Sequence, residues 1–373
     1  MTNGTNSDFI VIGAGIAGAS VAAELSAHGS VQLLEMESQP GYHATGRSAA
    51  FFAASYGNSL IRGMTGMCEQ FLFSPPDGFS EAPLIRARDC MIFGRPDQEQ
   101  QLLETGRDNP RLEFCTQEAV LSRVPVFSPG YLHGALRDPM GGDIDVDALL
   151  QGFLRLLRRR GGFLHNQHRA VSLERGSGIW NVTAGGEDFS APVVVNAAGA
   201  WADRIAESAG VGALGLTPLL RSAMLIDAPE GQEIDDWPFM IDVDEEFYFK
   251  PDAGALMICP ADETPSAPCD AQPDDYEMAV GIDRFEKATG LDIRKVNHSW
   301  AGLRTFAPDR TFVAGFDPRS EGFYWLAGQG GYGVQSAPAL AALSSALITD
   351  TQPGPGFEGV MQYAGSLSPD RLL

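Results

Sequence analysis

Basic residues are scarce in this sequence. The 26 lysines and arginines stand against 48 aspartates and glutamates, so the formal net charge is −22 at pH 7. Such a charge repels phosphate polymers and anionic lipid surfaces, and no basic face is evident along the chain. We therefore do not expect nucleic acid as a partner, and we interpret the acidity as an aid to solubility.

Cysteines and long apolar runs are also few. The five cysteines are an odd number without a C-x-x-C pair, which argues against a disulfide framework or a zinc site; they are Cys68, Cys90, Cys115, Cys259 and Cys269. No run approaches the ~18 apolar residues of a membrane helix. Residues 1–7 form a polar tail that lacks the basic and apolar regions of a signal peptide. We expect a soluble, unprocessed, cytoplasmic protein without a metal site.

The best-defined stretch is a glycine-rich turn near the N-terminus. Residues 9–12 are a continuous apolar run, typical of a central parallel strand, and lead directly into Gly13, Gly15 and Gly18, a G-x-G-x-x-G pattern. Gly13 permits the tight turn, Gly15 lets a pyrophosphate approach the backbone, and Gly18 lets the next helix pack on the strand. Because the strand, the helix and a distant acid, Glu35, all fall where this mechanism needs them, the pattern predicts a dinucleotide site.

The elements after that turn are equally regular. Apolar residues at one-turn spacing predict a helix that ends near Gly29, which is placed to cap it. A second strand at residues 31–34 ends in Glu35, whose carboxylate can accept both hydroxyls of an adenosine ribose. Met36 follows rather than an arginine, so a 2′-phosphate has no evident partner.

Residues 41–57 form a loop of small residues that passes into a helix. Thr45, Arg47 and Ser48 lie close in sequence to the nucleotide strand, so they are candidates for cofactor contacts. Helix capping by Thr45 or Ser48 explains these residues equally well, and the sequence leaves both interpretations open.

Two later strand-to-helix turns suggest that one long cofactor spans the fold. A buried strand at residues 192–196 ends in three small residues, 197–199, which allow a flat group to lie against the backbone. The glycine-rich loop at 328–333 opens a helix, so its N–H groups can stabilise an anion. This would suit the pyrimidine edge of a flavin, where negative charge accumulates on reduction. Each turn alone could serve only the core, but together with the N-terminal site they favour FAD.

Six sequence motifs follow one another along the chain: GAGIAGAS (13–20), GYHATGRSAA (41–50), VVNAAGAW (194–201), FYFKPDAG (247–254), WAGLRTF (300–306) and GQGGYGVQ (328–335). Across nearly its whole length the chain resembles the glycine oxidase/D-amino acid oxidase family of flavoproteins, with bacterial D-arginine dehydrogenases closest. The resemblance implies an α/β fold, in which a Rossmann-like FAD-binding domain carries an inserted, discontinuous α+β substrate domain built on an antiparallel sheet. The expected FAD-binding domain comprises residues 1–82, 142–214 and 300–373, and the substrate domain comprises 83–141 and 215–299.

The resemblance also implies that FAD is held noncovalently, because no Cys or His stands in the motifs where a covalent link would be matched. The residues expected to contact the cofactor are spread over all parts of its domain: Gly13, Gly15, Ile16, Ala17, Gly18, Glu35, Met36, Thr45, Arg47, Ser48, Ala50, Val171, Ala198, Gly199, Trp201, Gly302, Arg304, Gly330, Gly331, Tyr332, Gly333 and Val334.

For the substrate, the resemblance implies a carboxylate clamp. Arg221 and Arg304 match the arginines that hold the substrate carboxylate in similar enzymes, and a planar guanidinium gives the bidentate contact that lysine cannot. Tyr56 and Tyr248 match active-site tyrosines, and Gly331 matches a backbone carbonyl that accepts the substrate amine. We take Tyr56, Tyr248, Arg221 and Arg304 as the candidate catalytic set.

Departures from the D-arginine dehydrogenases bear on specificity. Those enzymes have a Glu where Cys90 stands, a His at Phe51 and a Thr at Ala53. Without the buried carboxylate a substrate guanidinium would stay unpaired, at a cost of roughly 3–5 kcal/mol, so Phe51 and Cys90 favour a neutral or apolar side chain. Asp89 is adjacent to Cys90, but on a strand it points to the opposite face unless the register slips.

We therefore expect an FAD-dependent amino-acid (amine) dehydrogenase or oxidase, similar to D-amino acid dehydrogenases, that transfers a hydride from Cα to flavin N5 and yields an imino acid. The expected partner is a small carboxylate-bearing amine, and the electron acceptor is left open. An N-alkylated amino acid or a 2-hydroxy acid would use the same clamp, and a non-catalytic flavin-binding role is the alternative outside enzymes.

Overall fold

Strand β1 (Phe9–Ile12) lies at the centre of a six-stranded sheet in this computed structural model, which describes residues 6–373. The strand order is β20–β21–β13–β1–β2–β9, parallel except for the antiparallel pair β20–β21. The other strands are β2 (Val31–Leu34), β9 (Phe163–His165), β13 (Val193–Asn196), β20 (Val313–Phe316) and β21 (Phe323–Ala327). Every residue of β1 is buried, as its apolar run predicts for a strand covered on both faces. Residues 1–5 of the predicted polar tail lie outside the described residues.

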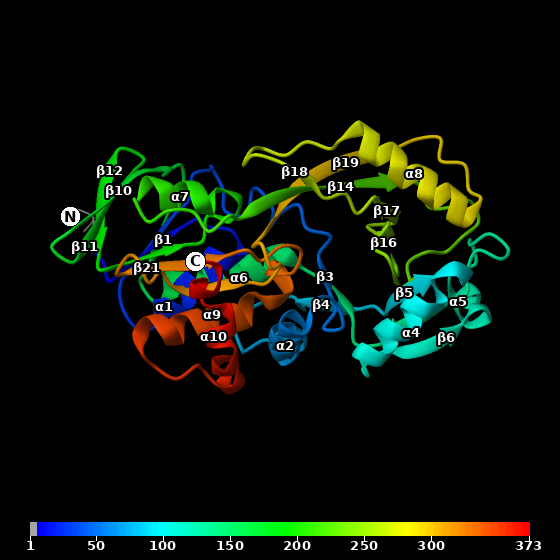
Figure 1. Ribbon diagram of the computed structural model, residues 1–373, viewed down its shortest axis with the longest axis horizontal. Coiled ribbons are helices and arrows are strands. Elements are labelled where there is room, and N and C mark those ends of the chain that lie inside the picture. The colour runs from blue at the N-terminus through cyan, green and yellow to red at the C-terminus, as the bar shows by residue number, and fades with distance from the viewer. Residues whose placement is uncertain (1–5) are drawn as a thin grey trace.

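Helices cover one face of this sheet and a second, smaller sheet covers the other (Figure 1). The helical side shares one core with β1 and comprises α1 (Ile16–Leu25), α6 (Val146–Arg159) and α9 (Gly333–Thr349). The opposite side comprises the antiparallel strands β10 (Ala170–Gly176), β11 (Ile179–Ala184) and β12 (Glu187–Ala191), together with α7 (Ala202–Ser208). The carboxyl ends of β1, β2 and β13 are thereby left as the open edge at which ligands bind such sheets.

A nine-stranded sheet forms a second lobe, and the C-terminus lies in the first lobe (Figure 1). Its order is β18–β14–β17–β16–β15–β5–β7–β6, with β19 also paired to β14. The pairs are antiparallel except β15–β5. Its strands are β5 (Cys90–Gly94), β6 (Glu113–Thr116), β7 (Gly134–Asp138), β14 (Thr217–Ile226), β15 (Phe239–Asp242), β16 (Tyr248–Asp252), β17 (Ala255–Cys259), β18 (Thr264–Pro265) and β19 (His298–Phe306).

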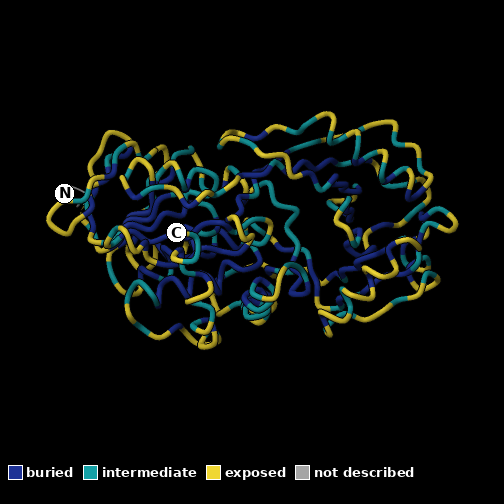
Figure 2. The backbone as a smooth tube through the Cα atoms, in the orientation of Figure 1, coloured by how far each residue is buried: buried dark blue, intermediate teal, exposed yellow. Residues whose placement is uncertain are grey.

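Helices α5 (Gln117–Arg123) and α8 (Asp275–Thr289) pack on one face of this second sheet. Helix α4 (Glu99–Asp108) packs near the end of the other face. The rest of that face carries Cys90, Phe239 and Tyr248, which pack against Phe51 and Ala53 at the junction between the lobes. Buried residues accordingly follow the strands of both lobes, whereas exposed ones lie on the outer loops and on the outward faces of helices such as α4 (Figure 2).

The lobes are joined by a three-stranded sheet of order β3–β8–β4. The remaining elements are β3 (Phe51–Phe52), β4 (Ile85–Ala87), β8 (Gly142–Ile144), α2 (Ser59–Met67), α3 (Glu69–Phe73), α10 (Ala364–Leu367) and short 3₁₀ turns at Pro96–Gln98, Gly199–Trp201, Glu358–Tyr363 and Pro369–Leu372. We propose the domain boundaries given above. One strand crosses the expected boundary at residue 300, because β19 begins at His298 and pairs along its whole length with β14.

One local expectation is wrong. Helix α1 ends at Leu25, its C-cap is Ser26, whose backbone remains right-handed, and Gly29 does not cap it. A Cβ at Gly29 would lie 2.7 Å from Oδ2 of Asp8, so glycine is required there for close packing rather than for a left-handed turn.

Within residues 6–373, none of the helices has both the length and the apolar character that a membrane crossing requires. The same residues contain no cluster of three or more His, Cys, Asp or Glu side chains arranged to hold a metal ion.

Candidate active site

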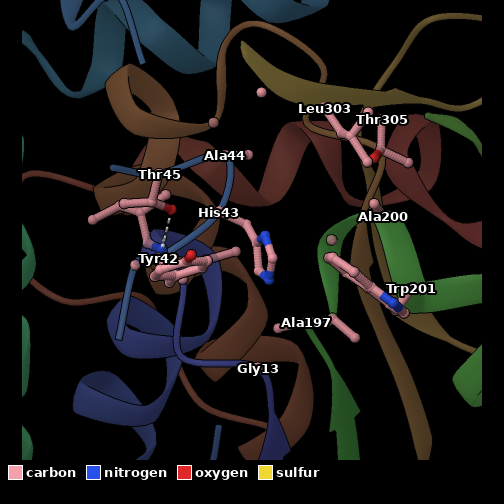
Figure 3. Close-up of a pocket in the computed structure, with 18 of the residues that line it drawn as sticks. Gly13, Tyr42, His43, Ala44, Thr45, Ala197, Ala200, Trp201, Leu303 and Thr305 are labelled. Atoms are coloured by element: carbon pink, nitrogen blue, oxygen red, sulfur yellow. Dashed lines mark hydrogen bonds between the residues drawn. The ribbon is translucent and has the colours of Figure 1, made fainter. Parts of the chain in front are cut away.

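A cavity of about 590 Å³ begins at the β1–α1 turn and reaches the second sheet. Its walls come from the carboxyl ends of β1, β2 and β13, from the loop before β3, and from β14, β19 and the start of α9. Figure 3 shows part of this wall, with Gly13 and Ala197 on neighbouring strand ends and Leu303 and Thr305 beyond them. The segments predicted to hold one cofactor therefore meet around a single cavity.

The glycines of the first turn are sterically required. Gly13 has φ +98°, and a Cβ there would lie 2.6 Å from the carbonyl oxygen of Ala197. A Cβ on Gly18 would lie 1.8 Å from the carbonyl oxygen of Gly13. Gly15 lines the cavity, and a Cβ on it would approach Oγ1 of Thr45 to 3.2 Å. Strand, turn and helix can pack this closely only because side chains are absent, as the sequence pattern predicts.

Glu35 lies at the end of β2 and lines the cavity although it is almost fully buried. Its Oε2 accepts a hydrogen bond from the backbone N–H of Ala14 at 2.7 Å, and its Oε1 accepts one from Glu37 N–H at 2.9 Å. These contacts fix the carboxylate, and Met36 and Val171 line the same cavity. The carboxylate is therefore placed where an adenosine ribose is expected.

The loop at 41–57 supports the capping interpretation only in part, because no helix begins at Thr45 or Ser48 and the next helix, α2, is capped by Asn58. Oγ1 of Thr45 instead accepts the N–H of Ile16 in the first turn of α1 at 3.0 Å, while Oγ of Ser48 accepts the N–H of Ala50 within its own turn. Thr45 and Ser48 also line the cavity.

Arg47 lines the cavity as well, but its guanidinium is engaged by the opposite wall. Nη2 pairs with Asp270 at 2.5 Å, and Nη1 donates to the carbonyl oxygens of Ala271 and Ala301 at 2.8 and 3.2 Å. The side chain thus ties the loop before β3 to the loop before α8.

His43 is a cavity residue that the sequence reasoning missed. Its Nε2 lies 2.8 Å from Oε1 of Glu37, and its ring centroid lies 4.6 Å from that of Trp201. Figure 3 shows the His43 ring between Tyr42 and Trp201. Only the position of His43 inside the quoted motif could have suggested it, because a single histidine in a loop carries no pattern of its own.

The C-terminal glycine loop closes the far end of the cavity. Gly330 has φ +54°, and a Cβ there would meet the Phe306 ring at 2.2 Å. A Cβ on Gly331 would lie 2.9 Å from Nη1 of Arg304, so a side chain there would displace that guanidinium. Helix α9 begins at Gly333, and its first residues line the cavity, so the positive end of its dipole faces the interior.

Arg221 and Arg304 lie on the same face of the second sheet. The register pairs Arg221 with Gly302 and Leu219 with Arg304, so the two arginines are diagonal neighbours across β14 and β19. Nη2 of Arg304 donates to the hydroxyl of Tyr248 at 3.1 Å. All three side chains line the cavity beside the glycine loop.

Several buried polar atoms around the cavity have no partner among residues 6–373. They include Nη1 of Arg221, Oγ1 of Thr305 and Nε2 of Gln329. Since buried polar groups are normally hydrogen-bonded, this wall fits a ligand that carries polar groups along its length. FAD is such a ligand, and the glycine cradle and Glu35 suit its dinucleotide portion.

A smaller cavity of about 50 Å³ adjoins Arg304 and Gly331. Phe51, Phe239 and Ile241 line it, as does Tyr56. The residues that line it are mainly apolar.

One acid, Glu245, also lines this smaller cavity, and the sequence reasoning missed it. The hydroxyl of Tyr56 donates to Oε2 of Glu245 at 2.9 Å. Burial and the neighbouring carboxylate raise the pKa of Tyr56 well above its usual value, so the phenol is neutral. Glu245 has φ +55° in the turn between β15 and β16, and a surface turn rich in acids gives no sequence signal for a pocket residue.

Of the predicted cofactor residues, Ala50 lines only the smaller cavity, and Gly18 and Tyr332 line neither. Gly18 acts through packing, and the Tyr332 ring lies 5.1 Å from that of Tyr56. The remaining ones line the large cavity: Gly13, Gly15, Ile16, Ala17, Glu35, Met36, Thr45, Arg47, Ser48, Val171, Ala198, Gly199, Trp201, Gly302, Arg304, Gly330, Gly331, Gly333 and Val334.

Cys90 lines neither cavity, although it is fully buried on the sheet face that Phe239 and Tyr248 share. Any influence of Cys90 on the substrate must act through those neighbours. The adjacent Asp89 accepts hydrogen bonds from Arg123 and, at 2.7 Å, from Arg137. This carboxylate is therefore engaged outside the two cavities.

The chain is similar to known proteins both in sequence and in fold. A family model described as FAD dependent oxidoreductase matches residues 8–347. FAD-dependent oxidoreductase domain-containing protein 1 of Xenopus laevis is 28% identical over 178 residues, which cover 42% of this chain and 35% of that protein. The match thus spans about a third of the length of that relative.

Two solved structures share the fold across nearly the whole chain. Glycine oxidase from Geobacillus kaustophilus has a TM-score of 0.82 at 18% identity, covering 94% of this chain and 98% of that one. L-proline dehydrogenase from P. horikoshii has a TM-score of 0.81 at 20% identity, covering 98% and 97%. With the family model matching most of its length, this chain belongs to the FAD dependent oxidoreductase family.

Proposed function

We propose that this protein oxidises the Cα–N bond of an amino acid in the manner of a D-amino acid dehydrogenase or oxidase. One observation carries the proposal: Arg221 and Arg304 stand side by side on one sheet face, at the end of the cavity that the C-terminal glycine loop closes. Two guanidinium groups at that place suit a carboxylate whose attached carbon lies beside the flavin ring. The specific similarity to D-arginine dehydrogenases, which the sequence motifs suggest, is also part of this proposal.

In this proposal the protein binds and orients, and FAD, when bound, accepts the hydride. Arg221 and Arg304 hold the carboxylate, and the Tyr248 hydroxyl, bonded to Arg304, shapes the site. The carbonyl of Gly331 accepts a hydrogen bond from the substrate amine. Because both tyrosines of the site remain neutral, we assign neither as a base, and the amine binds without its extra proton.

The smaller cavity would take the substrate side chain. Its volume of about 50 Å³ and its lining of Phe51, Phe239 and Ile241 favour a small, neutral or apolar group. Glu245, at the same pocket, already accepts the hydrogen bond of Tyr56. We therefore keep the prediction of poor activity on D-arginine and D-lysine.

An N-alkylated amino acid or a 2-hydroxy acid is the second candidate. The L-proline dehydrogenase of similar fold is named for a substrate whose amine is secondary. The same carboxylate clamp would serve such a compound, with the alkyl group in the smaller cavity.

Anaerobic bleaching of the yellow holoprotein tests these candidates together. The panel comprises both enantiomers of alanine and valine, D-arginine, glycine, sarcosine, proline and lactate. We expect D-alanine or D-valine to bleach the flavin and D-arginine to do so at least about tenfold more slowly. Bleaching by sarcosine or proline alone would favour the second candidate. No bleaching by any compound would reject the carboxylate substrate class and favour a non-catalytic flavin-binding role.

A further inference from the structure

The guanidinium of Arg221 is held from behind by the loop that follows β17. Its Nε donates to the carbonyl oxygen of Asp262 at 2.8 Å, and its Nη2 donates to Oε1 of Glu263 at 3.1 Å. Asp262 is itself fixed, because its carboxylate accepts the N–H and hydroxyl of Ser222 at 2.7 and 3.0 Å. Nη1 has no partner among residues 6–373. The loop thus sets the plane of the guanidinium and leaves one amino group for a ligand.

The carboxylate of Glu263 is bound in turn by the guanidinium of Arg310. Nη2 of Arg310 donates to Oε1 of Glu263 at 2.7 Å, and Nη1 donates to Oε2 at 3.0 Å. The Arg310 guanidinium also lies over the Phe306 ring, 4.0 Å from its centroid. Neither Glu263 nor Arg310 lines either of the two cavities described above, and the Arg310 side chain is half exposed.

This arrangement places one carboxylate between two guanidinium groups. Burial opposes ionisation of Glu263, but the hydrogen bonds and charge of Arg310, with the charge of Arg221, outweigh it and hold the pKa of Glu263 below its usual value. Because Arg310 binds both oxygens, it compensates the charge of Glu263. The positive charge of Arg221 then remains for a ligand, in a buried position where an uncompensated charge is costly and an arriving anion is favoured.

We propose that Glu263 and Arg310 are a positioning pair for the substrate carboxylate. Glu263 orients Arg221, and Arg310 prevents Glu263 from competing with the substrate for that guanidinium. The inference rests on the proposed function, since it takes the ligand of Arg221 to be a carboxylate. It makes Arg310 a determinant of carboxylate affinity although Arg310 lies outside the cavity.

Benzoate binding to the FAD-loaded protein tests the pair, through the change that benzoate causes in the flavin absorption spectrum. In R310M the freed charge of Glu263 should weaken benzoate binding about tenfold, the size of one charge-assisted hydrogen bond. In R310M/E263Q the competing charge is removed while a side-chain oxygen still accepts from Arg221, so affinity should return to within about threefold of wild type. R175M, which breaks the pair between Arg175 and Glu321, is the matched control and should change nothing.

Recovery in the double variant separates positioning from a structural role, because a structural defect would persist or deepen when the second residue is changed. With an oxidisable substrate the same pattern should appear in KM, with kcat little changed. Equal benzoate affinity in wild type and R310M, or no recovery in R310M/E263Q, would overturn the inference and leave the proposed function standing. Wild-type holoprotein that shows no response to benzoate would count against the proposed function and overturn the inference with it.

Discussion

The phenol of Tyr248 shows how individual residues set the protonation of the site. Burial and the neighbouring thiol of Cys259 raise the pKa of Tyr248 to about 12, against the opposing charges of Arg304 and Arg221. Below that pH the phenol is neutral and donates or accepts hydrogen bonds but removes no proton. Tyr248 therefore contributes to the site through its position and its hydrogen bond to Arg304.

The first residue-scale prediction concerns pH. The rate of flavin reduction should rise with pH as the substrate amine loses its proton, and no falling limb from Tyr248 should appear below its pKa of about 12. Anaerobic stopped-flow reduction measured from pH 6 to pH 10 checks this in wild type and in Y248F. Disappearance of the rising limb in Y248F would instead identify Tyr248 as the base.

The second residue-scale prediction concerns Cys90. Restoring the glutamate of D-arginine dehydrogenases, C90E, should not confer activity on D-arginine, because position 90 lines neither cavity. A carboxylate buried beside Phe239 and Tyr248 without a partner should lower the free energy of unfolding by roughly 3–5 kcal/mol. Urea unfolding measures this, with C269S at an exposed cysteine as the control. A stable C90E protein that oxidises D-arginine would contradict the placement of Cys90.

The sequence identified some residues of the candidate site and missed others. Arg221 and Arg304 were identified through motif resemblance, because an isolated arginine carries no local signal. Glu245 and Phe239 were missed because tertiary packing, not a sequence pattern, brings their loop and strand against Tyr56.

Among the elements, local patterns predicted those whose cause is local. The β1–turn–α1 unit forms as expected, since its apolar run, glycine pattern and apolar spacing lie within the segment itself. By contrast, residues 59–73 form two helices, α2 and α3, which are separated at Cys68. The Cys68 thiol is buried and contacts the N–H of Ala339 in α9, a contact distant in sequence.

The element-scale prediction concerns the β1–α1 turn. G18A would place a methyl group 1.8 Å from the carbonyl oxygen of Gly13, so we expect a purified protein without flavin and a loss of about 1–3 kcal/mol in stability. G66A, in the last turn of α2 with open space around it, is the control and should be neutral or slightly stabilising. Absorbance at the flavin band and thermal unfolding measure both, and a G18A protein that keeps its flavin would contradict the role of this turn.

Across the whole molecule, the cavity differs in charge from the rest of the chain. The molecule has a net charge of −22, yet the acid lining the large cavity is Glu35, against five arginines: Arg47, Arg169, Arg204, Arg221 and Arg304. The composition argues against polymeric anions as partners, but it gives no hint of a local site for small anions. Charges distant in sequence create that site only after folding.

The whole-molecule prediction concerns the junction of the lobes. Asp143 on β8 accepts from Arg88 at 2.6 Å and from the buried Lys250 of β16 at 2.9 Å. D143N should leave Lys250 poorly compensated and lower the free energy of unfolding by about 3 kcal/mol. D283N, which breaks the exposed pair with Lys287, should cost less than about 0.5 kcal/mol. Equal effects of the two variants in urea unfolding would show that the buried pair does not hold the lobes together.

A crystal structure of the FAD-loaded protein with benzoate tests the central claim most directly. We predict that the isoalloxazine ring lies beside the C-terminal glycine loop and that the benzoate carboxylate lies about 2.7–3.2 Å from both guanidinium groups, of Arg221 and Arg304. A flavin ring at the other end of the cavity, or a carboxylate bound away from these two arginines, would contradict the account.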